Sequence, residues 1–354
     1  MPDAGELTPE RVADELLGNL RTAPACAHVS FSEPPVRITG GFETLIFGFR
    51  LSDDASPELS GRLVVRVLSE PGGVTSGRME AAFQNAVAAA GFPAPRVVFA
   101  GGERTMGGRA FNVMERVSGH AMIEDLFADP AAGTRVADQL AEVHAQLHEL
   151  PVAGVADALE AAGVPREAVS VDGQLHLVRR FGAEPALGRL GDCADWLLEN
   201  RPPERGGLSV CHGDFHPGNV MVDGGRVTGV IDWSGPGIAH HEHDLAVTLV
   251  LIAVAAPALV QSAPPGMFEA FADGYLATYA RHRPVDADRL RYYRALRSFR
   301  AFAHGSAART PGIDPALVPR DQYPWAEAGL MRRLAGVLHE TTGLDVPLPS
   351  GLEA

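Results

Sequence analysis

Polar residues of types that can do chemistry crowd one short segment, HGDFHPGN at residues 212–219. Asp214 follows an apolar run, and a carboxylate at the end of a buried strand is held rigidly in place. A Pro-Gly turn then brings the chain back, so that the amide oxygen of Asn219 can face Asp214. The segment GVIDW follows and adds Asp232. The pattern predicts that two carboxylates and one amide oxygen face the same cavity.

This set of side chains suits a hard divalent cation together with a base. Mg²⁺ prefers oxygen ligands, takes few of them from protein and completes its shell with phosphate and water. Asp214 would then be free to orient or deprotonate a hydroxyl group. Taken singly, an Asp or Asn in a loop is also ordinary turn chemistry. The hypothesis depends on H-G-D-x-H-x-x-N, the next apolar strand and IDW occurring together.

The elements that must position these residues divide the chain into a β-rich part and a helical part. A capped amphipathic helix is predicted over residues 8–20. Strands are predicted within 35–51, over 62–68 and within 95–117, with a helix over 78–91, which makes a sheet of about five strands crossed by one helix. From Ser118 onward helical periodicity dominates. One predicted helix spans residues 134–150, and residues 194–200 form the end of another. Further helices are predicted near 241–261, 267–283, 287–306 and 325–341.

We therefore expect an α+β protein of two lobes, because 354 residues exceed one small core. Residues 1–24 would form an N-terminal helix, and residues 25–117 a small lobe built on an antiparallel sheet with one helix. Residues 118–354 would form a larger, mostly α-helical lobe that contains the polar loop. Ligands usually bind in the cleft between two such lobes.

Composition narrows the classes of function. A formal charge of −14 argues against a dedicated nucleic-acid-binding protein. The three cysteines are scattered without C-x-x-C spacing. The N-terminus lacks an apolar signal segment. The longest apolar run, residues 245–260, is too short to cross a bilayer and predicts a buried helix. These features predict a cytoplasmic protein without a membrane partner. The chain contains no lysine, which excludes Schiff-base chemistry and leaves arginine to bind phosphate.

The segments HGDFHPGN and VIDW resemble those of the aminoglycoside phosphotransferase and choline kinase-like family of small-molecule kinases. The resemblance implies the two-lobe protein-kinase-like fold and extends more weakly over residues 36–300. It implies that Asp214 is the catalytic base, that Asn219 and Asp232 bind Mg²⁺, and that Asp244 supports the loop. ATP or GTP would be the phosphate donor.

The N-terminal lobe contains matching candidates in the order that the resemblance requires. Gly40 and Gly41 lie where the family has its nucleotide-covering hairpin, although Gly-Gly is also an ordinary turn. Arg66, at the centre of LVVRV, takes the place of the usual lysine on the α/β-phosphates, unless it faces solvent on an edge strand. Glu80 would be its ion-pair partner, or else an ordinary surface glutamate near a helix start.

The segment NVMERVSG, residues 112–119, matches the family's connector between the lobes. Backbone groups of Glu115 to Val117 would bind the purine, with Met114 against its face. The alternative is a plain strand end.

The function that these residues predict is Mg²⁺-dependent transfer of the γ-phosphate of ATP or GTP to a hydroxyl of a small molecule. An aminoglycoside, a macrolide and a metabolic alcohol are all candidate acceptors, and the enzyme would be a monomer or homodimer. The alternative is a nucleotide-binding pseudokinase with a regulatory role, which only Arg66 favours. A protein kinase is disfavoured, because IDW replaces D-F-G and no A-P-E segment follows.

The acceptor itself stays open. The later helices contain acidic residues and tyrosines that would suit an aminated sugar, but also alternate arginine with aromatic residues, which would suit an acidic or macrocyclic acceptor. The residues concerned are Glu269, Asp273, Asp286, Asp288, Tyr275, Tyr279, Tyr292, Tyr293, Arg291, Arg294 and Arg297. The cluster AHHEH, residues 239–243, lacks a matching metal-ligand pair, so zinc binding is disfavoured. His212 is interpreted as a brace of the loop, and Cys211 as inert.

Overall fold

A computed structural model describes residues 7–23, 26–38, 45–53, 55–71, 74–101, 105–188, 190–203, 207–260, 263–318, 324–349 and 351–352. The chain divides into two compact units. One contains Met1–His120, Ala153–Val164 and Met221–Trp233, and the other contains Ala121–Val152, Pro165–Val220 and Ser234–Ala354. The first unit thus includes two segments, 153–164 and 221–233, from the region predicted as the helical lobe.

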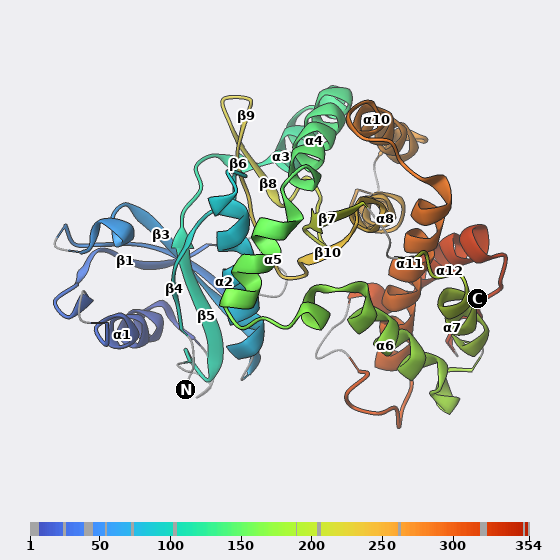
Figure 1. The fold of residues 1–354 in the computed structure, drawn as a ribbon, viewed down its shortest axis with the longest axis horizontal. Coiled ribbons are helices and arrows are strands. Elements are labelled where there is room, and N and C mark those ends of the chain that lie inside the picture. The colour runs from blue at the N-terminus through green and yellow to red at the C-terminus, as the bar shows by residue number, and fades with distance from the viewer. Residues whose placement is uncertain are drawn as a thin grey trace. The chain divides into compact units, whose positions relative to one another are not determined.

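The first unit is built on a five-stranded antiparallel sheet, as predicted (Figure 1). Its strands lie in the order β1-β2-β3-β5-β4. The strands are β1 Phe31–Ile38, β2 Leu45–Leu51, β3 Arg62–Pro71, β4 Val97–Ala100 and β5 Arg109–Glu115. Helix α1, Pro9–Leu20, begins where the sequence predicts, because the Thr8 side chain accepts a hydrogen bond from the Arg11 N–H at 3.3 Å.

Helix α2, Val74–Ala89, is the one helix of this lobe that the sequence places differently. The sequence predicts a helix over 78–91, but α2 begins four residues earlier, at Val74, although the Gly, Ser and Thr residues of its first turn, VTSG, favour turns over helix interiors. Successive side chains of β3 point alternately to the face of the sheet that α1 covers and to the face that α2 covers. Leu63, Val65 and Val67 of β3 belong to the core that includes α1, whereas Val64 packs against the core that includes Ala81 of α2.

Two smaller sets of elements complete the polar region of the chain. Strands β6 His120–Ala121, β8 Val220–Asp223 and β9 Arg226–Val230 form a three-stranded sheet in the order β6-β8-β9. Strands β7 Leu208–Cys211 and β10 Gly237–His240 pair with each other antiparallel. The loop HGDFHPGN therefore runs from the end of β7 to the start of β8, between two buried strands, as the sequence predicts.

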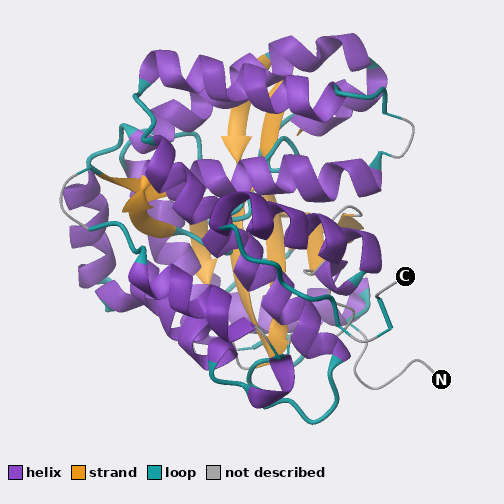
Figure 2. Cartoon of the chain, turned by 90° about the vertical axis from the view of Figure 1, so that its right-hand side faces the viewer, coloured by secondary structure: helices purple, strands orange, loops and turns teal. Residues whose placement is uncertain are grey.

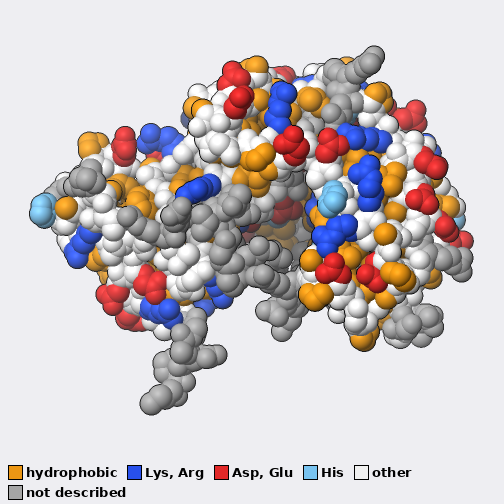
Figure 3. Space-filling view, turned by 60° about the horizontal axis from the view of Figure 1, so that its bottom comes forward, with side chains coloured by type: hydrophobic (Ala, Val, Ile, Leu, Met, Phe, Trp, Pro, Cys, Tyr) orange, Lys and Arg blue, Asp and Glu red, His pale blue; other side chains and the backbone are white. Residues whose placement is uncertain are grey.

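The second unit is mostly helical (Figure 2). Helix α10 packs along α4, and α11 packs against both α8 and α12. The helices are α3 Met122–Ala128, α4 Gly133–His148, α6 Val171–Gly182, α7 Leu190–Glu199, α8 His241–Val250, α9 Ala256–Leu259, α10 Met267–His282, α11 Ala287–Arg309 and α12 Ala328–Thr342, while α5, Val152–Ala161, lies almost entirely in the first unit. On the face that Figure 3 shows, arginine and carboxylate side chains lie interspersed over the surface.

The apolar run predicted as a buried helix forms α8, a π-helical turn at Leu251–Ala255 and α9. By length and composition alone, His241–Ala258 could cross a membrane, but 67% of this stretch is buried inside the fold. That burial is typical of the core helix of a globular unit. Helix α8 matters for the site because its first turn carries Asp244.

Candidate active site

The loop begins with a tight backbone approach at Gly213. Its φ is +81°, a conformation that glycine adopts without strain, and a Cβ at this position would lie 1.8 Å from the carbonyl oxygen of Gly235. Only glycine fits there, and it turns the chain directly after β7. Asp214 consequently leaves the end of the strand in a fixed direction.

Asp214 and Asn219 lie together, as their spacing predicts. The Asn219 amide donates Nδ2–H hydrogen bonds to the backbone oxygen of Asp214 at 2.9 Å and to Oδ2 of its carboxylate at 3.3 Å. These bonds fix the orientation of the amide, and they leave its oxygen Oδ1 available to a cation. An oxygen donor suits Mg²⁺. Of the predicted metal ligands, Asn219 therefore fits the ion by its chemistry.

The carboxyl of Asp214 favours its ionised form. Burial opposes ionisation, but the contact with His216, followed by the charge of Arg297, lowers the pKa of Asp214 below its ordinary value. A base must be deprotonated to accept a proton, so this environment suits the role that the resemblance implies for Asp214.

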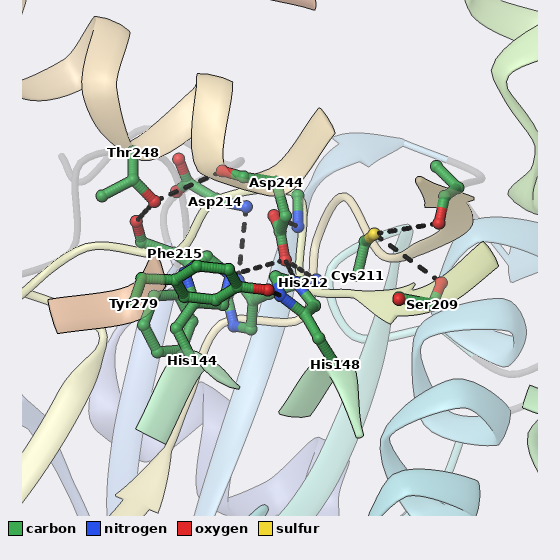
Figure 4. A network of polar contacts seen from close by, with 12 residues as sticks. His144, His148, Ser209, Cys211, His212, Asp214, Phe215, Asp244, Thr248 and Tyr279 are labelled. Carbon is green, nitrogen blue, oxygen red and sulfur yellow. Dashed lines mark hydrogen bonds and ion pairs between the residues drawn. The ribbon is translucent and has the colours of Figure 1, made fainter. Parts of the chain in front are cut away.

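Asp244 supports the loop by accepting hydrogen bonds from its backbone (Figure 4). Its carboxylate accepts hydrogen bonds from the backbone N–H of His212 at 2.6 Å and of Gly213 at 2.8 Å. Two histidines of α4 approach the same carboxylate, with Nε2 of His144 at 3.0 Å and Nε2 of His148 at 3.3 Å from Oδ2. All three side chains are fully buried.

Two tyrosines of α10 contact the other ring nitrogens of these histidines. The hydroxyl of Tyr275 lies 2.6 Å from Nδ1 of His144, and that of Tyr279 lies 2.7 Å from Nδ1 of His148. If each hydroxyl donates, each neutral ring carries its proton on Nε2 and donates it to Asp244. Burial lowers the pKa of His144, and burial followed by the charge of His144 lowers the pKa of His148 to about 4.

The charge in this network resides on Asp244. Burial opposes its ionisation, but its contacts with His144 and His148 hold the pKa of Asp244 well below the ordinary value. The atoms of these three residues are close enough together to hold a metal ion. However, both nitrogens of each ring already have hydrogen-bonding partners, and the carboxylate accepts four donors. The arrangement is therefore complete as a hydrogen-bonded support of the loop.

Arg66 and Glu80 form an ion pair in the first unit. Arg66 extends from β3 on the side of the sheet where α2 lies, and both side chains are buried. Burial raises the pKa of Glu80, while the charge and hydrogen bond of Arg66 oppose that rise. Since β3 is the middle strand and both side chains are buried, the alternatives of an arginine facing solvent on an edge strand and of a surface glutamate are wrong.

Arg66 also binds Asp232. Its Nη2 lies 2.8 Å from Oδ1 of the aspartate, so one guanidinium joins two carboxylates. Asp232 has a positive φ of 63°, a strained conformation that aspartate tolerates better than most residues. The next residue, Trp233, is fully buried and donates Nε1–H to Val230 O at 2.9 Å, which fixes the chain there. The meeting of Asp232 with Asp214 and Asn219 in one cavity stays a prediction.

In the connector, the backbone N–H of Val117 has no hydrogen-bonding partner among the described residues. Glu115 N–H donates to Arg96 O and Arg116 N–H donates to Arg62 O, both at 3.0 Å, which leaves the N–H of Val117 for a purine. The side chain of Glu115 pairs with Arg96 at 2.7 Å. Gly40 and Gly41 lie outside the described residues.

Other candidates from the sequence turn out to be parts of the core. Tyr275, Tyr279, Tyr292 and Tyr293, considered for the acceptor site, are all buried, and their hydroxyls contact His144, His148, Leu197 O and His240 respectively. Burial raises the pKa of the Cys211 thiol well above its ordinary value, which agrees with an inert cysteine. The histidines of AHHEH contact separate partners, Tyr293, Pro284 O and Gln174.

Sequence reasoning missed His144 and His148. They lie in a helix that was predicted correctly, but only its apolar periodicity was interpreted. Histidines spaced i and i+4 on one helix face, directed into an apolar core, are the signal that could have identified them.

The fold and the loop together define a protein-kinase-like phosphotransferase, with an antiparallel five-stranded sheet followed by a mostly helical region. The sequence matches the model of the phosphotransferase enzyme family over residues 37–285, so the chain belongs to that family. Aminoglycoside 3'-phosphotransferase from Streptomyces fradiae is 35% identical over 213 residues, which cover 59% of this chain and 74% of the relative. The human acyl-CoA dehydrogenase family member 11 is 30% identical over 172 residues, but these cover only 21% of that protein.

Solved structures share the fold. A putative aminoglycoside phosphotransferase from Ralstonia eutropha has a TM-score of 0.61 at 21% identity, covering 93% of this chain and 98% of the other. A thermostable mutant of aminoglycoside phosphotransferase APH(4)-Ia, in a ternary complex with ADP and hygromycin B, has a TM-score of 0.60 at 17% identity, covering 94% of this chain and 99% of the other.

Proposed function

We propose that this phosphotransferase moves the γ-phosphate of ATP or GTP to a hydroxyl group of a small molecule, with Mg²⁺ as cofactor. The observation that carries the proposal is the pairing of Asp214 with Asn219 in a loop held by Gly213 and Asp244. It places a carboxylate with a lowered pKa beside an amide oxygen suited to a metal ion.

In this proposal the acceptor oxygen attacks the γ-phosphorus, and the bond between that phosphorus and the bridging oxygen of the nucleotide breaks. The hydroxyl proton passes to the carboxylate of Asp214, and the nucleoside diphosphate leaves. Asn219 and Asp232 would hold Mg²⁺, which neutralises charge on the phosphates when it is bound. Arg66 would bind phosphate oxygens while Glu80 holds its guanidinium in place.

Relatives support a nucleotide donor and an antibiotic-like acceptor. The APH(4)-Ia mutant was solved with ADP and hygromycin B, and an aminoglycoside 2'-phosphotransferase-IIIa mutant was solved with GDP. The relatives at 35% identity are aminoglycoside 3'-phosphotransferases of two Streptomyces species. We therefore place aminoglycosides first among acceptors, ahead of macrolides and metabolic alcohols.

The test is a labelled-phosphate assay on the purified chain. ATP and GTP with a radioactive γ-phosphate are each incubated with neomycin, hygromycin B, erythromycin, choline and homoserine, with Mg²⁺ or with EDTA. We expect label in at least one acceptor and only when Mg²⁺ is present. Nucleotide binding without transfer to any acceptor would favour a pseudokinase. Absence of Mg²⁺-dependent nucleotide binding, measured by calorimetry, would contradict the whole proposal.

We also propose that the enzyme works in the cytoplasm as a monomer or homodimer, without a nucleic-acid or membrane partner. Its three cysteines are buried and unpaired, which suits a reducing compartment, and its formal charge is −14. Fractionation of the host cells and light scattering of the purified protein would test these points.

A further inference from the structure

His216 lies between Asp214 and the loop's Pro-Gly turn, and the chemical step proposed above gives it no role in orienting the base. Its ring rests directly against the backbone of Gly218. A Cβ on Gly218 would lie 2.8 Å from Cε1 and 2.9 Å from Nδ1 of the imidazole. The absence of a side chain at Gly218 therefore makes room for the ring.

A backbone donor indicates which ring nitrogen of His216 carries the proton. The N–H of Gly218 donates to Nδ1 at 3.1 Å, so Nδ1 must be the unprotonated nitrogen of the neutral ring. The proton then resides on Nε2. This nitrogen faces Asp214 and lies 3.6 Å from Oδ2 of the carboxylate.

The two oxygens of the Asp214 carboxylate therefore have different surroundings. Oδ2 faces Nε2–H of His216 and also accepts the Nδ2–H of Asn219 at 3.3 Å. Oδ1 has no hydrogen-bonding partner among the described residues. The oxygen without a donor is the one able to accept a hydroxyl proton.

Exposure distinguishes His216 from a packing residue. Its side chain is 29% exposed and that of Asp214 is 33% exposed, whereas the intervening Phe215 is fully buried and stacks on His144 at 3.8 Å between ring centroids. The loop thus directs Phe215 into the core and directs His216 and Asp214 outward together.

We propose that His216 is a positioning residue for the catalytic base: its Nε2–H holds Oδ2 of Asp214, so that Oδ1 faces the acceptor hydroxyl. This inference rests on the proposed function and deepens it. The separation of 3.6 Å is longer than an ideal hydrogen bond, and catalytic contacts often shorten only when the substrates are bound.

The first test compares three substitutions. His216→Ala removes the ring, His216→Phe keeps an aromatic ring without N–H, and His216→Gln supplies a new N–H donor. The assay is ADP release, with the best acceptor of the panel and with water alone as acceptor. We expect kcat to fall about tenfold or more in the Ala and Phe variants, with KM for ATP changed less than about twofold. The Gln variant should recover most of the loss.

His176→Ala on α6 is the matched control, because His176 is exposed on the same unit. It should leave kcat and the melting temperature unchanged. An unchanged kcat in His216→Ala would overturn the inference. A wild-type kcat in His216→Phe would also overturn the inference, because the role of His216 would then be ring packing alone.

A double-mutant cycle tests the geometry independently. Gly218→Ala should displace the ring and reproduce the kcat loss of His216→Ala, but it should add almost nothing in the His216→Ala background. If each substitution lowered kcat by its own factor and the two factors multiplied in the double variant, the proposed contact would be contradicted.

Nitrogen-15 NMR of the histidine rings adds a readout that needs no activity. We expect the proton of His216 on Nε2, and a proton on Nδ1 would overturn the assignment. A wild-type protein that labels no acceptor and hydrolyses no ATP contradicts the proposed function. An active wild type with an unaffected His216→Ala variant contradicts only this inference.

Discussion

Arg66 stands where the resemblance to the family implies a lysine. Its guanidinium joins Glu80 and Asp232 at once, which an ammonium on a single flexible stem could not do with the same planar geometry. The substitution of arginine for lysine therefore keeps the charge and adds a second carboxylate contact. It links the strand β3 to the segment that carries a predicted metal ligand.

Replacing Arg66 with methionine should destabilise the protein by about 3 kcal/mol or more, because Glu80 would be left buried without its partner. Arg66→Lys should retain much of that stability, since a positive charge remains beside Glu80. Urea unfolding measures both effects. Arg50→Met is the control, because Arg50 is an exposed arginine on the neighbouring strand β2. Equal stabilities of the Arg66→Met and Arg50→Met variants would contradict the importance of the ion pair.

The catalytic loop shows how an element positions its residues. Gly213 packs its Cα against Gly235, Asp244 binds the two N–H groups before Asp214, and Thr248 Oγ1 donates to Phe215 O at 2.7 Å. Two of these contacts come from successive turns of α8. The loop is therefore held by one helix of the core rather than by its own turn residues alone.

Gly213→Ala should be among the most damaging single changes in the loop. It combines a positive φ of +81° with a Cβ 1.8 Å from a carbonyl oxygen, so the backbone must move. Gly225→Ala is a close control, because Gly225 has a φ of +77° and no neighbour within 4 Å of a Cβ. We expect Gly225→Ala to cost about 1 kcal/mol and Gly213→Ala several times more, measured by chemical denaturation. Similar costs would show that the close approach to Gly235 does not constrain the loop.

The whole molecule shows what sequence reasoning can and cannot supply. The five-stranded sheet, most helices of the second unit and the Asp214–Asn219 pairing were predicted, because each depends on periodicity or spacing within a short segment. The support by His144, His148 and Tyr275 was not predicted. It depends on which faces of α4, α8 and α10 meet, and hydrophobic periodicity does not specify those pairings. For the same reason, the sequence did not show that the tyrosines considered for the acceptor site are buried.

Buried neutral histidines should make the stability of the molecule depend on pH. The pKa of His148 is about 4 in the fold and 6.5 ordinarily, so between these values the unfolded chain binds more protons than the native state. Stability should rise as pH increases from about 4 to 6.5 and should level off above that range. The change in protonation of His148 alone should raise the free energy of unfolding by about 3 kcal/mol over this pH interval.

Thermal melting between pH 4.5 and 7.5 measures this dependence. His148→Gln should flatten the slope relative to wild type, because it removes the titrating group while a side-chain amide can still donate to Asp244. A melting temperature that is the same at pH 5 and pH 7 in the wild type would contradict the buried neutral assignment.

The central claim is that Asp214 acts in the chemical step of phosphate transfer. The most direct measurement compares Asp214→Asn with wild type for kcat and for affinity toward nucleotide in the presence of Mg²⁺. The amide keeps the size of the side chain but cannot accept the proton. We predict that kcat falls by about 10² to 10⁴ while nucleotide affinity stays within about twofold. Transfer of phosphate at the wild-type rate by Asp214→Asn would contradict the claim.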